Sequence, residues 1–356
     1  MAWARKSLDD LKPYRPGKRV SEVRQELGLD EIIKLSSNES PLPPLRSARR
    51  AMAKAAKGLN RYPDGACHLL RDRLSHRLNT AYERIVIGNG SNELIRLLAQ
   101  VVLEPGDEIV IGEPSFIVYP LVAKIMGAET TRVALKDLTH DLEAMSAAVT
   151  KKTKLIFVCN PNNPTGTIVS AKTAGSFMAS IPKDVLVCFD EAYHEYVVDP
   201  AYRTALEMTA DHQNVVVLRT FSKIYGLAGT RIGYGVMPPE IVEAIDKVRE
   251  PFNVNTLGQV GAFWSLEDEM EITKRRLYTQ RQKEKVHAAL DRLGFDYADS
   301  QTNFVYLDSK KPAMEAFDEL KRQGVIVRAF PGSNYIRVTL GTSSENNKLI
   351  EALAAL

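Results

Sequence analysis

Short apolar runs with the character of β-strands recur between helical patterns along most of the chain. Strands separated by helices favour a mostly parallel central sheet wrapped by helices, so we predict an α/β fold. Ligands of such sheets bind beyond the carboxyl ends of the strands, which makes the residues after each run the first candidates for a functional site. The main runs cover residues 108–111, 130–135, 154–159, 185–189, 215–218 and 231–236.

Chemically suggestive residues follow four of these runs. Phe116 comes after the first run, and the turn 160–166 (NPNNPTG) comes after the third. The tetrapeptide 190–193 (DEAY) and Lys223 follow the next two runs along the chain. Packing alone does not explain four such groups at one edge of a sheet, so we expect them to form one site.

The stretch 220–235 (TFSKIYGLAGTRIGYG) places Lys223 directly after Ser222, with Arg231 eight positions further on. A lysine that loses its proton near neutral pH can form a Schiff base with an aldehyde cofactor, and desolvation or nearby positive charge lowers its pKa. The hydroxyls of Thr220 and Ser222 together with Arg231 would cradle a phosphate ester. For the Ser-Lys pair alone, a surface lysine beside a helix cap is the alternative.

The hexapeptide 88–93 (GNGSNE) joins a short strand to an apolar helix. A strand, a glycine turn and a helix N-terminus make an anion site, because unpaired backbone amides point at the phosphate. The hexapeptide is neither a Walker A motif nor a complete dinucleotide fingerprint. A tight turn capped by Ser91 is the alternative interpretation.

Asp190 closes an apolar strand, where a carboxylate is costly unless a cation meets it. A protonated pyridine nitrogen would be such a cation. Tyr193 and Asn163 are then placed to hydrogen-bond the phenolic oxygen of the ring, and Phe116 could stack on its face. Each residue also has a structural alternative: a cap for Asp190, a turn for Asn163, and the core for Tyr193 and Phe116.

Composition excludes several classes of partner. Net charge is +3 without a long basic or acidic block, which disfavours nucleic acid and membrane surfaces. No apolar run approaches the ~20 residues that span a bilayer. Cys67, Cys159 and Cys188 lack metal-type spacing, as do His68 and His194, so we expect buried thiols and no metal. We therefore expect a soluble, cytoplasmic protein.

The order of patterns predicts three parts. Residues 1–36 form an arm that packs with the small domain, 37–251 form a large domain, and 252–356 form a smaller α+β domain. The turn-rich segment 36–44 would present Asn38 to a pocket. The last helix opens on a sequence like a capping box, Ser343-Ser344-Glu345-Asn346.

These motifs resemble the signature of the fold-type I pyridoxal-phosphate aminotransferases. The resemblance covers the whole chain and rests on NNPTG at 162–166, DEAY at 190–193, and Ser222-Lys223 followed by Arg231. More narrowly, the chain is similar to the histidinol-phosphate aminotransferase branch, and aromatic and threonine-phosphate relatives share several of these narrower motifs. They are LKPY at 11–14, LSSNE at 35–39, YPD at 62–64, GNGSNE at 88–93 and IRVTLGT at 336–342.

The resemblance implies a pyridoxal 5'-phosphate cofactor. Lys223 would carry the aldimine and shuttle a proton between the substrate and the cofactor, and Asp190 would pair with the pyridine nitrogen. Tyr193 and Asn163 would contact the ring hydroxyl. The phosphate would be held by Thr220, Ser222, Arg231, the amides of Ser91 and Asn92, and Tyr62 from the partner subunit of a homodimer.

The resemblance also implies a ping-pong exchange between glutamate and a phosphorylated amino alcohol, histidinol phosphate. Arg337 would bind the glutamate α-carboxylate and, in the other half-reaction, the substrate phosphate. Arg328, Tyr14 and Asn38 would be further substrate contacts. Two departures from the family pattern bear on substrate choice: no glycine follows the proline in 38–43 (NESPLP), and the loop between Arg328 and Arg337 is short.

Other functions remain as alternatives. Within the fold these are an aromatic amino-acid aminotransferase and a decarboxylase that acts on a phosphorylated amino acid. A cofactor-binding regulatory module is disfavoured because no helix-turn-helix extension or basic N-terminal arm is present. A nicotinamide dehydrogenase is disfavoured because the chain lacks a complete glycine fingerprint.

Overall fold

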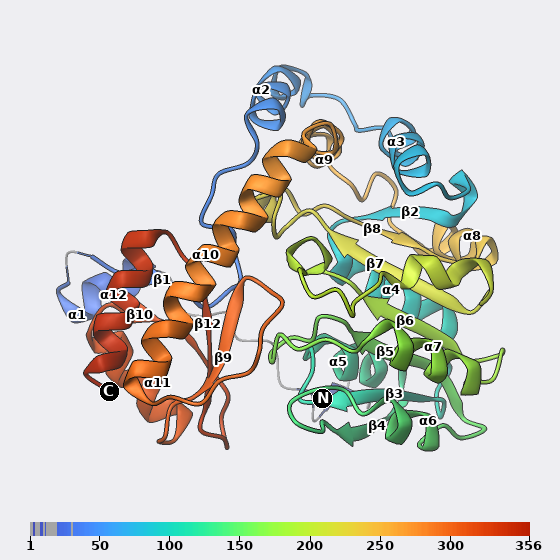
Figure 1. The fold of residues 1–356 in the computed structure, drawn as a ribbon. Helices are drawn as coiled ribbons and strands as arrows, with labels where there is room; N and C mark the ends of the chain where they lie inside the picture. Colours follow the sequence, from blue (N-terminus) through green and yellow to red (C-terminus); the bar gives the residue numbers. More distant parts are fainter. Residues whose placement is uncertain (1–2, 4–7, 10, 12–19, 30) are drawn as a thin grey trace.

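The computed structural model describes residues 3, 8–9, 11, 20–29 and 31–356. Its centre is a seven-stranded sheet in which all strands except β8 run parallel, as the sequence predicts (Figure 1). From edge to edge the strands are β2 (Ile85–Gly88), β8 (Gly233–Val236), β7 (Val215–Thr220), β6 (Leu186–Asp190), β5 (Thr153–Cys159), β3 (Glu108–Glu113) and β4 (Glu129–Ala134).

Helices cover both faces of this sheet, which is why its strands are continuous apolar runs. Along β5, Leu155 and Phe157 join the core on one face, while Ile156 and Val158 join the core on the other. The first core includes α4 (Ser91–Val102), α5 (Val118–Met126) and α8 (Pro239–Val248). The second includes α6 (Leu142–Ala147) and α7 (Ala171–Ser180).

A third core lies beside β2 and β8, at the upper edge of the sheet in Figure 1. It includes residues of α3 (His68–Leu78) and α9 (Thr256–Leu266), and α9 packs along α2 (Arg46–Ala55). Short 3-10 turns complete the large unit at Ala56–Gly58, Tyr82–Arg84, His194–Tyr196, Ala205–Ala210 and Ala228–Thr230.

The smaller unit contains an antiparallel sheet in the order β11 (Arg328–Ala329), β12 (Tyr335–Thr339) and β9 (Phe304–Asp308). Its helices are α10 (Glu269–Leu293), α11 (Ala313–Arg322) and α12 (Ser343–Ala354). The N-terminal segment joins this unit, because β1 (Ile33–Lys34) pairs with β10 (Val325–Ile326) and follows α1 (Val20–Leu27). The domain boundaries after residues 36 and 251 remain a prediction.

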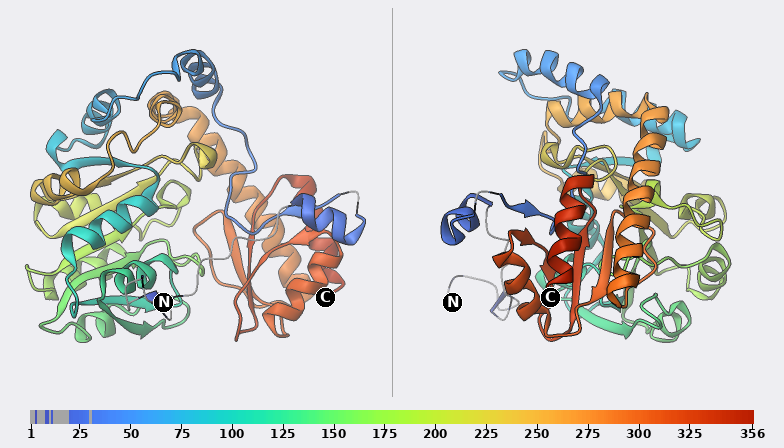
Figure 2. Two further views of the ribbon diagram at one scale, coloured as in Figure 1. Left: turned by 180° about the vertical axis from the view of Figure 1, so that it is seen from behind. Right: turned by 60° about the vertical axis from the view of Figure 1, so that its left-hand side comes forward.

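Helix α10 connects the two units. Figures 1 and 2 show it running from the region of α9 into the smaller unit. Asp268 caps its start, and Gly294 ends it in the left-handed conformation with φ of 70°. Among the helices of the described residues, none is both long and apolar enough to cross a membrane.

The cap of α12 corrects one prediction from the sequence. The side chain of Thr342, not that of Ser343, accepts the amide of Glu345, and the Glu345 carboxylate accepts the amide of Thr342. The capping box therefore starts one residue earlier than predicted. The reason is that Thr342 has extended backbone angles while Ser343 is already helical.

Candidate active site

A cavity of about 560 Å³, here called the functional pocket, opens beyond the carboxyl ends of β5, β6 and β7 and is closed on one side by β11 and β12. It brings together nearly all of the predicted site residues. They are Asn38, Ser91, Asn92, Phe116, Asn163, Asp190, Tyr193, Thr220, Ser222, Lys223, Arg231, Arg328 and Arg337.

Tyr62 is not among the residues that line the pocket. Tyr62 is 82% exposed and stacks on Phe252, with ring centroids 4.7 Å apart. It therefore does not reach the pocket of its own chain. Tyr14 lies outside the described residues.

Lys223 lies just after β7, in the turn that the sequence identified, with its Nζ 5.4 Å from the centre of the Tyr193 ring. Burial lowers the pKa of Lys223 to about 8, and the charges of Arg337 and Arg231 act in the same direction. Glu39 and Asp190 oppose this shift. Lys223 thus has the lowered pKa that the sequence analysis required of a reactive amine.

Asp190 is the last residue of β6 and is 3% exposed. Tyr119 Oη donates a hydrogen bond to Asp190 Oδ2 at 2.8 Å, and the amide of Ala192 donates to Oδ1 at 3.2 Å. Burial raises the pKa of Asp190 to about 6, although both hydrogen bonds favour the ionised form. No ion pair to Asp190 occurs among the described residues, so its carboxylate suits a cationic ligand.

Two amide side chains that line the pocket are held in defined orientations. Arg337 Nη1 donates to Asn163 Oδ1, which makes the side-chain nitrogen of Asn163 the atom that can donate to a ligand. Asn38 Nδ2 donates to Tyr193 Oη at 2.8 Å. Asn38 has a left-handed backbone with φ of 54° and is fixed by Thr339, whose Oγ1 accepts the Asn38 amide at 2.9 Å.

A further group of lining residues has the chemistry that suits an anion. The first amides of α4, from Ser91 and Asn92, point out of the helix and have no partner within it. Arg231 Nη1 donates to Ser222 Oγ at 3.3 Å. Gly90 has φ of 83°, and a Cβ there would lie 2.5 Å from Arg231 Nη2, so this close approach requires glycine.

A second cationic region lies on the smaller unit. Arg328 of β11 and Arg337 of β12 occupy directly opposed positions in the antiparallel ladder, and both line the pocket. Arg337 Nη2 also donates to the carbonyl of Ser36 at 2.9 Å. Like charges in directly opposed positions are unfavourable by themselves, so this arrangement suits an anionic ligand.

The donor set fits a phosphorylated pyridine aldehyde. Amides, hydroxyls and Arg231 match a phosphate, a buried carboxylate matches a protonated ring nitrogen, and Lys223 matches an aldehyde. The sequence analysis missed Tyr119, because a tyrosine on an apolar helix is usually part of the core. Its ring does pack in the core, stacked on Phe157 with centroids 4.4 Å apart.

Comparison with known proteins gives consistent results. Residues 30–353 match the family model of aminotransferase class I and II. The chain is 44% identical over 353 residues to a histidinol-phosphate aminotransferase of Moorella thermoacetica, covering 98% of this chain and 92% of that protein. It is 42% identical over 349 residues to an aromatic amino acid aminotransferase of Thermobifida fusca, and the match covers 98% of this chain and 95% of that protein.

Among solved structures, the chain is similar to a histidinol-phosphate aminotransferase from Sinorhizobium meliloti in complex with pyridoxal-5'-phosphate. The TM-score is 0.91 at 28% identity, and the match covers 100% of this chain and 97% of that one.

Proposed function

Because the chain belongs to the class I and II aminotransferases, we propose that it transfers an amino group between two substrate pairs. One pair is L-glutamate and 2-oxoglutarate, and the other is L-histidinol phosphate and imidazole-acetol phosphate, in histidine biosynthesis. The observation that carries this proposal is the opposed pair Arg328 and Arg337 at the substrate side of the pocket. Two adjacent guanidinium groups suit a phosphate dianion as well as a carboxylate.

The cofactor is pyridoxal 5'-phosphate, which when bound supplies an electron sink that acidifies the α-carbon of an attached amine. We infer that Lys223 holds its aldehyde and that Asp190 pairs with its ring nitrogen. Tyr193 and the side-chain nitrogen of Asn163 would bind the ring hydroxyl, with Phe116 at the ring face. The phosphate would be bound by Thr220, Ser222, Arg231 and the amides of Ser91 and Asn92.

Lys223 would also move the proton. A pKa of about 8 leaves a larger neutral fraction near neutral pH than an ordinary lysine has, and in its neutral form Nζ can accept the α-proton of the substrate and return it later. The same chain groups serve both half-reactions. Arg337 would orient the amino acid by its α-carboxylate, and Arg328 and Asn38 would complete the substrate contacts.

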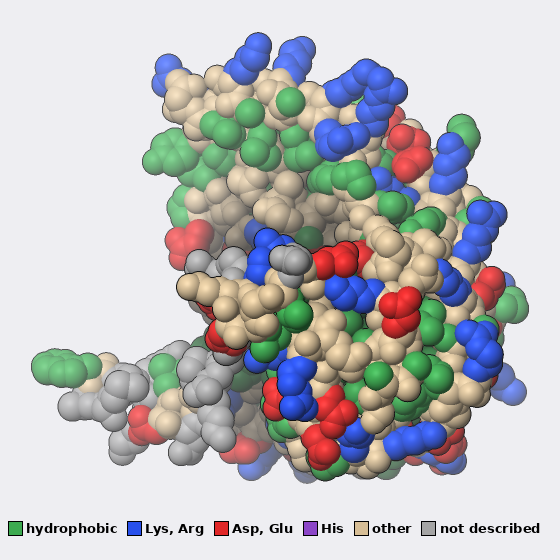
Figure 3. Space-filling model, turned by 90° about the vertical axis from the view of Figure 1, so that its left-hand side faces the viewer, with side chains coloured by type: hydrophobic (Ala, Val, Ile, Leu, Met, Phe, Trp, Pro, Cys, Tyr) green, Lys and Arg blue, Asp and Glu red, His purple; other side chains and the backbone are tan. Residues whose placement is uncertain are grey.

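We also propose that the protein works as a cytoplasmic homodimer in which Tyr62 reaches the phosphate of the partner's site. Support comes from the exposure of Tyr62 and of other large apolar side chains on the neighbouring segments. Figure 3 shows hydrophobic side chains gathered over the upper part of a hollowed face. The large apolar side chains that are exposed on Tyr62's own segment and the segments near it are Leu59, Tyr62, Leu69, Phe252 and Trp264. Three buried free thiols, at Cys67, Cys159 and Cys188, suit a reducing cytoplasm.

The test uses each half-reaction alone. Purified holoenzyme is mixed with excess glutamate, without a second substrate, and 2-oxoglutarate is quantified. One equivalent per subunit is expected, with none from Lys223→Ala. Histidinol phosphate should likewise yield one equivalent of imidazole-acetol phosphate. Failure of wild-type protein to release 2-oxoglutarate would refute the transaminase proposal.

A second candidate, an aromatic amino-acid aminotransferase, is favoured by the similarity to the Thermobifida fusca enzyme. The ratio of kcat/KM for histidinol phosphate and phenylalanine separates the two. A ratio well above one supports the first proposal, and a ratio well below one supports the second. Release of carbon dioxide from a phosphorylated amino acid would indicate a decarboxylase instead.

A further inference from the structure

Arg275 is a buried arginine outside the functional pocket. It lies on α10, is 5% exposed, and donates two hydrogen bonds to backbone carbonyls. Nη1 donates to the carbonyl of Ile224 at 3.2 Å, and Nη2 donates to that of Pro43 at 2.7 Å. Arg275 Nε also lies 3.5 Å from Glu271 Oε1, one turn earlier on the same helix. Because burying a guanidinium is costly, the use of its two Nη atoms on carbonyls of distant segments indicates a specific structural demand.

The two carbonyls belong to segments that bring residues into the pocket. Ile224 directly follows Lys223. Pro43 belongs to the segment 36–44, here called the linker, which carries Asn38 and Glu39 to the pocket lining. One guanidinium therefore ties the turn of the proposed reactive lysine to the linker.

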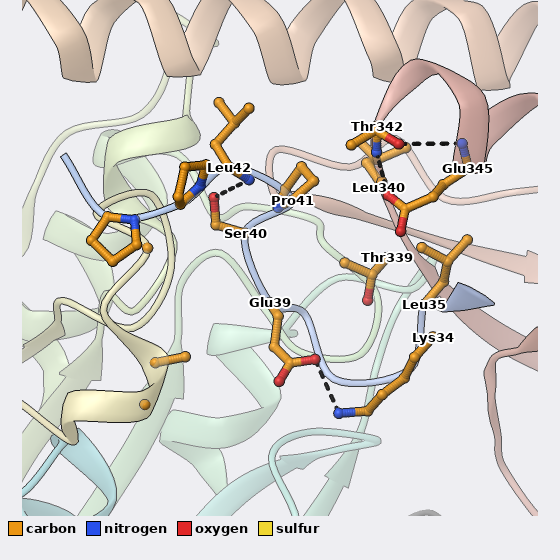
Figure 4. A pocket seen from close by; sticks show the side chains of 16 residues that line it. Lys34, Leu35, Glu39, Ser40, Pro41, Leu42, Thr339, Leu340, Thr342 and Glu345 are labelled. Atoms are coloured by element: carbon orange, nitrogen blue, oxygen red, sulfur yellow. Dashed lines mark hydrogen bonds and ion pairs between the residues drawn. The ribbon is translucent and has the colours of Figure 1, made fainter. Parts of the chain in front are cut away.

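The linker contributes lining residues to two cavities. A second cavity of about 550 Å³ is lined by Ser40, Pro41, Leu42 and residues 339–342, while Glu39 and Ala228 line both cavities. Figure 4 shows the linker passing along the lining of this second cavity from Glu39 to Leu42. Hydrogen bonds to its carbonyls hold the linker: Asn303 Nδ2 donates to those of Asn38 and Glu39, and Arg275 Nη2 donates to that of Pro43 at its far end.

Gly226 completes the junction. Its amide donates to the carbonyl of Lys223 at 3.0 Å, and its φ is 70°. A Cβ at this position would lie 3.0 Å from the carbonyl oxygen of Leu42 and 3.2 Å from Arg275 Nη1. A methyl group at position 226 would therefore press on both the linker and Arg275.

We propose that Arg275 is a positioning residue that holds the turn of Lys223 against the linker and so sets the place of the Lys223 amine in the pocket. Since α10 extends into the smaller unit, the same contact relates that unit to the lysine. The role of the lysine rests on the proposed function, but the placement of its amine can be measured without turnover.

The experiment compares full-length wild-type protein with Arg275→Met, Arg275→Lys and Gly226→Ala. Lys274→Met, an exposed neighbour on α10, is the matched control. Before cofactor is added, the acylation of Lys223 by trace acetic anhydride is followed against pH by peptide mass spectrometry. Thermal unfolding midpoints, and the rate of 2-oxoglutarate release by the holoenzymes, are recorded for each variant.

We expect the wild-type midpoint of acylation near pH 8. Arg275→Met should move it upward by about one pH unit, because a displaced amine regains water. Arg275→Lys should give an intermediate shift, since one amine can reach one carbonyl. Gly226→Ala should shift it in the same direction by pushing the linker away. The rate should fall about tenfold in Arg275→Met and be unchanged in Lys274→Met.

If the acylation midpoints of Arg275→Lys and Gly226→Ala equal that of the wild-type protein, the proposal is overturned, even if Arg275→Met does not fold. A loss of thermal stability with an unchanged midpoint and rate would also overturn it, because that pattern is a purely structural role. Absence of 2-oxoglutarate from wild-type protein would refute the transaminase proposal alone, since the acylation midpoints would still report the placement of Lys223.

Discussion

Arg328 and Arg337 stand directly opposite each other on the antiparallel strands β11 and β12, with both side chains in the lining of the functional pocket. Opposed side chains on such strands lie close enough to bind one ligand together. Arg337 is further located by the carbonyl of Ser36 and by the ring of Phe304, which lies 5.3 Å from its guanidinium carbon. Under the proposed function, the pair would bind the anionic end of the substrate.

We predict that the two arginines differ in their effects. Arg337→Lys should lower kcat/KM for glutamate and histidinol phosphate alike by about 100-fold, because a lysine cannot replace a planar two-pronged donor. Arg328→Met should lower the value for histidinol phosphate about tenfold more than that for phenylalanine. Arg322→Lys on the exposed side of α11 is the control. Equal losses for both substrates in Arg328→Met would contradict a role in phosphate binding.

A second prediction concerns Tyr119. Its hydrogen bond stabilises the ionised form of Asp190, so Tyr119→Phe should raise the pKa of Asp190 above about 6. Cofactor affinity should then be lost on the acid side at a pH about one unit higher than in wild-type protein. Fluorescence titration with pyridoxal phosphate at a series of pH values between 5 and 8, which brackets the Asp190 pKa of about 6, measures this affinity. Identical profiles would show that Tyr119 does not act on Asp190.

Hybrid dimers test the origin of Tyr62. Lys223→Ala and Tyr62→Ala homodimers should each be impaired. If Tyr62 serves the partner's site, a mixed dimer has one doubly defective site and one intact site, so mixing should restore activity. If Tyr62 acts within its own chain, every site of the mixed dimer carries a defect and mixing restores nothing. Sedimentation analysis of the wild-type protein provides the oligomeric state.

The pKa of Lys223 predicts a pH-dependent stability of the cofactor-free protein. The folded value, about 8, lies below the value of about 10.4 for an unfolded lysine. Between these values the folded state binds fewer protons, so the contribution of Lys223 to stability rises with pH. The free-energy cost of burying the charged Lys223 amine is therefore fully present below pH 8 and absent above about pH 10.4. The thermal unfolding midpoint of Lys223→Met should therefore be higher than that of wild-type protein at pH 7, and the difference between the two midpoints should shrink toward pH 10.

The capping box of α12 allows a stability prediction far from the pocket. Thr342→Ala removes the acceptor for the Glu345 amide and should cost about 1 kcal/mol of unfolding free energy. Ser343→Ala should cost less, because Ser343 is the first helical residue and does not cap. Urea unfolding compares the two variants. A larger loss in Ser343→Ala would support the cap that the sequence pattern alone indicated.

Local sequence determined the elements and much of the pocket. Periodicity and turn residues act over a few positions, so the strands before Asp190 and Lys223 could be placed from the chain alone. The parallel sheet then dictates that their carboxyl ends share an edge, and the structure does bring Phe116, Asn163 and Asp190 together there. The cap of α12 lies at Thr342, one residue before the predicted position, because each of the consecutive hydroxyl residues 342–344 could cap a helix and local sequence does not distinguish them.

Only the tertiary structure decided which distant residues touch. Tyr119 and Arg275 look in the sequence like a core tyrosine and a surface arginine, yet one bonds to Asp190 and the other to Pro43 and Ile224. The opposition of Arg328 and Arg337 depends on strand register, and the exposure of Tyr62 depends on where its loop packs. Burial and hydrogen-bond partners arise from contacts between segments far apart in the chain, which no local pattern of residues encodes.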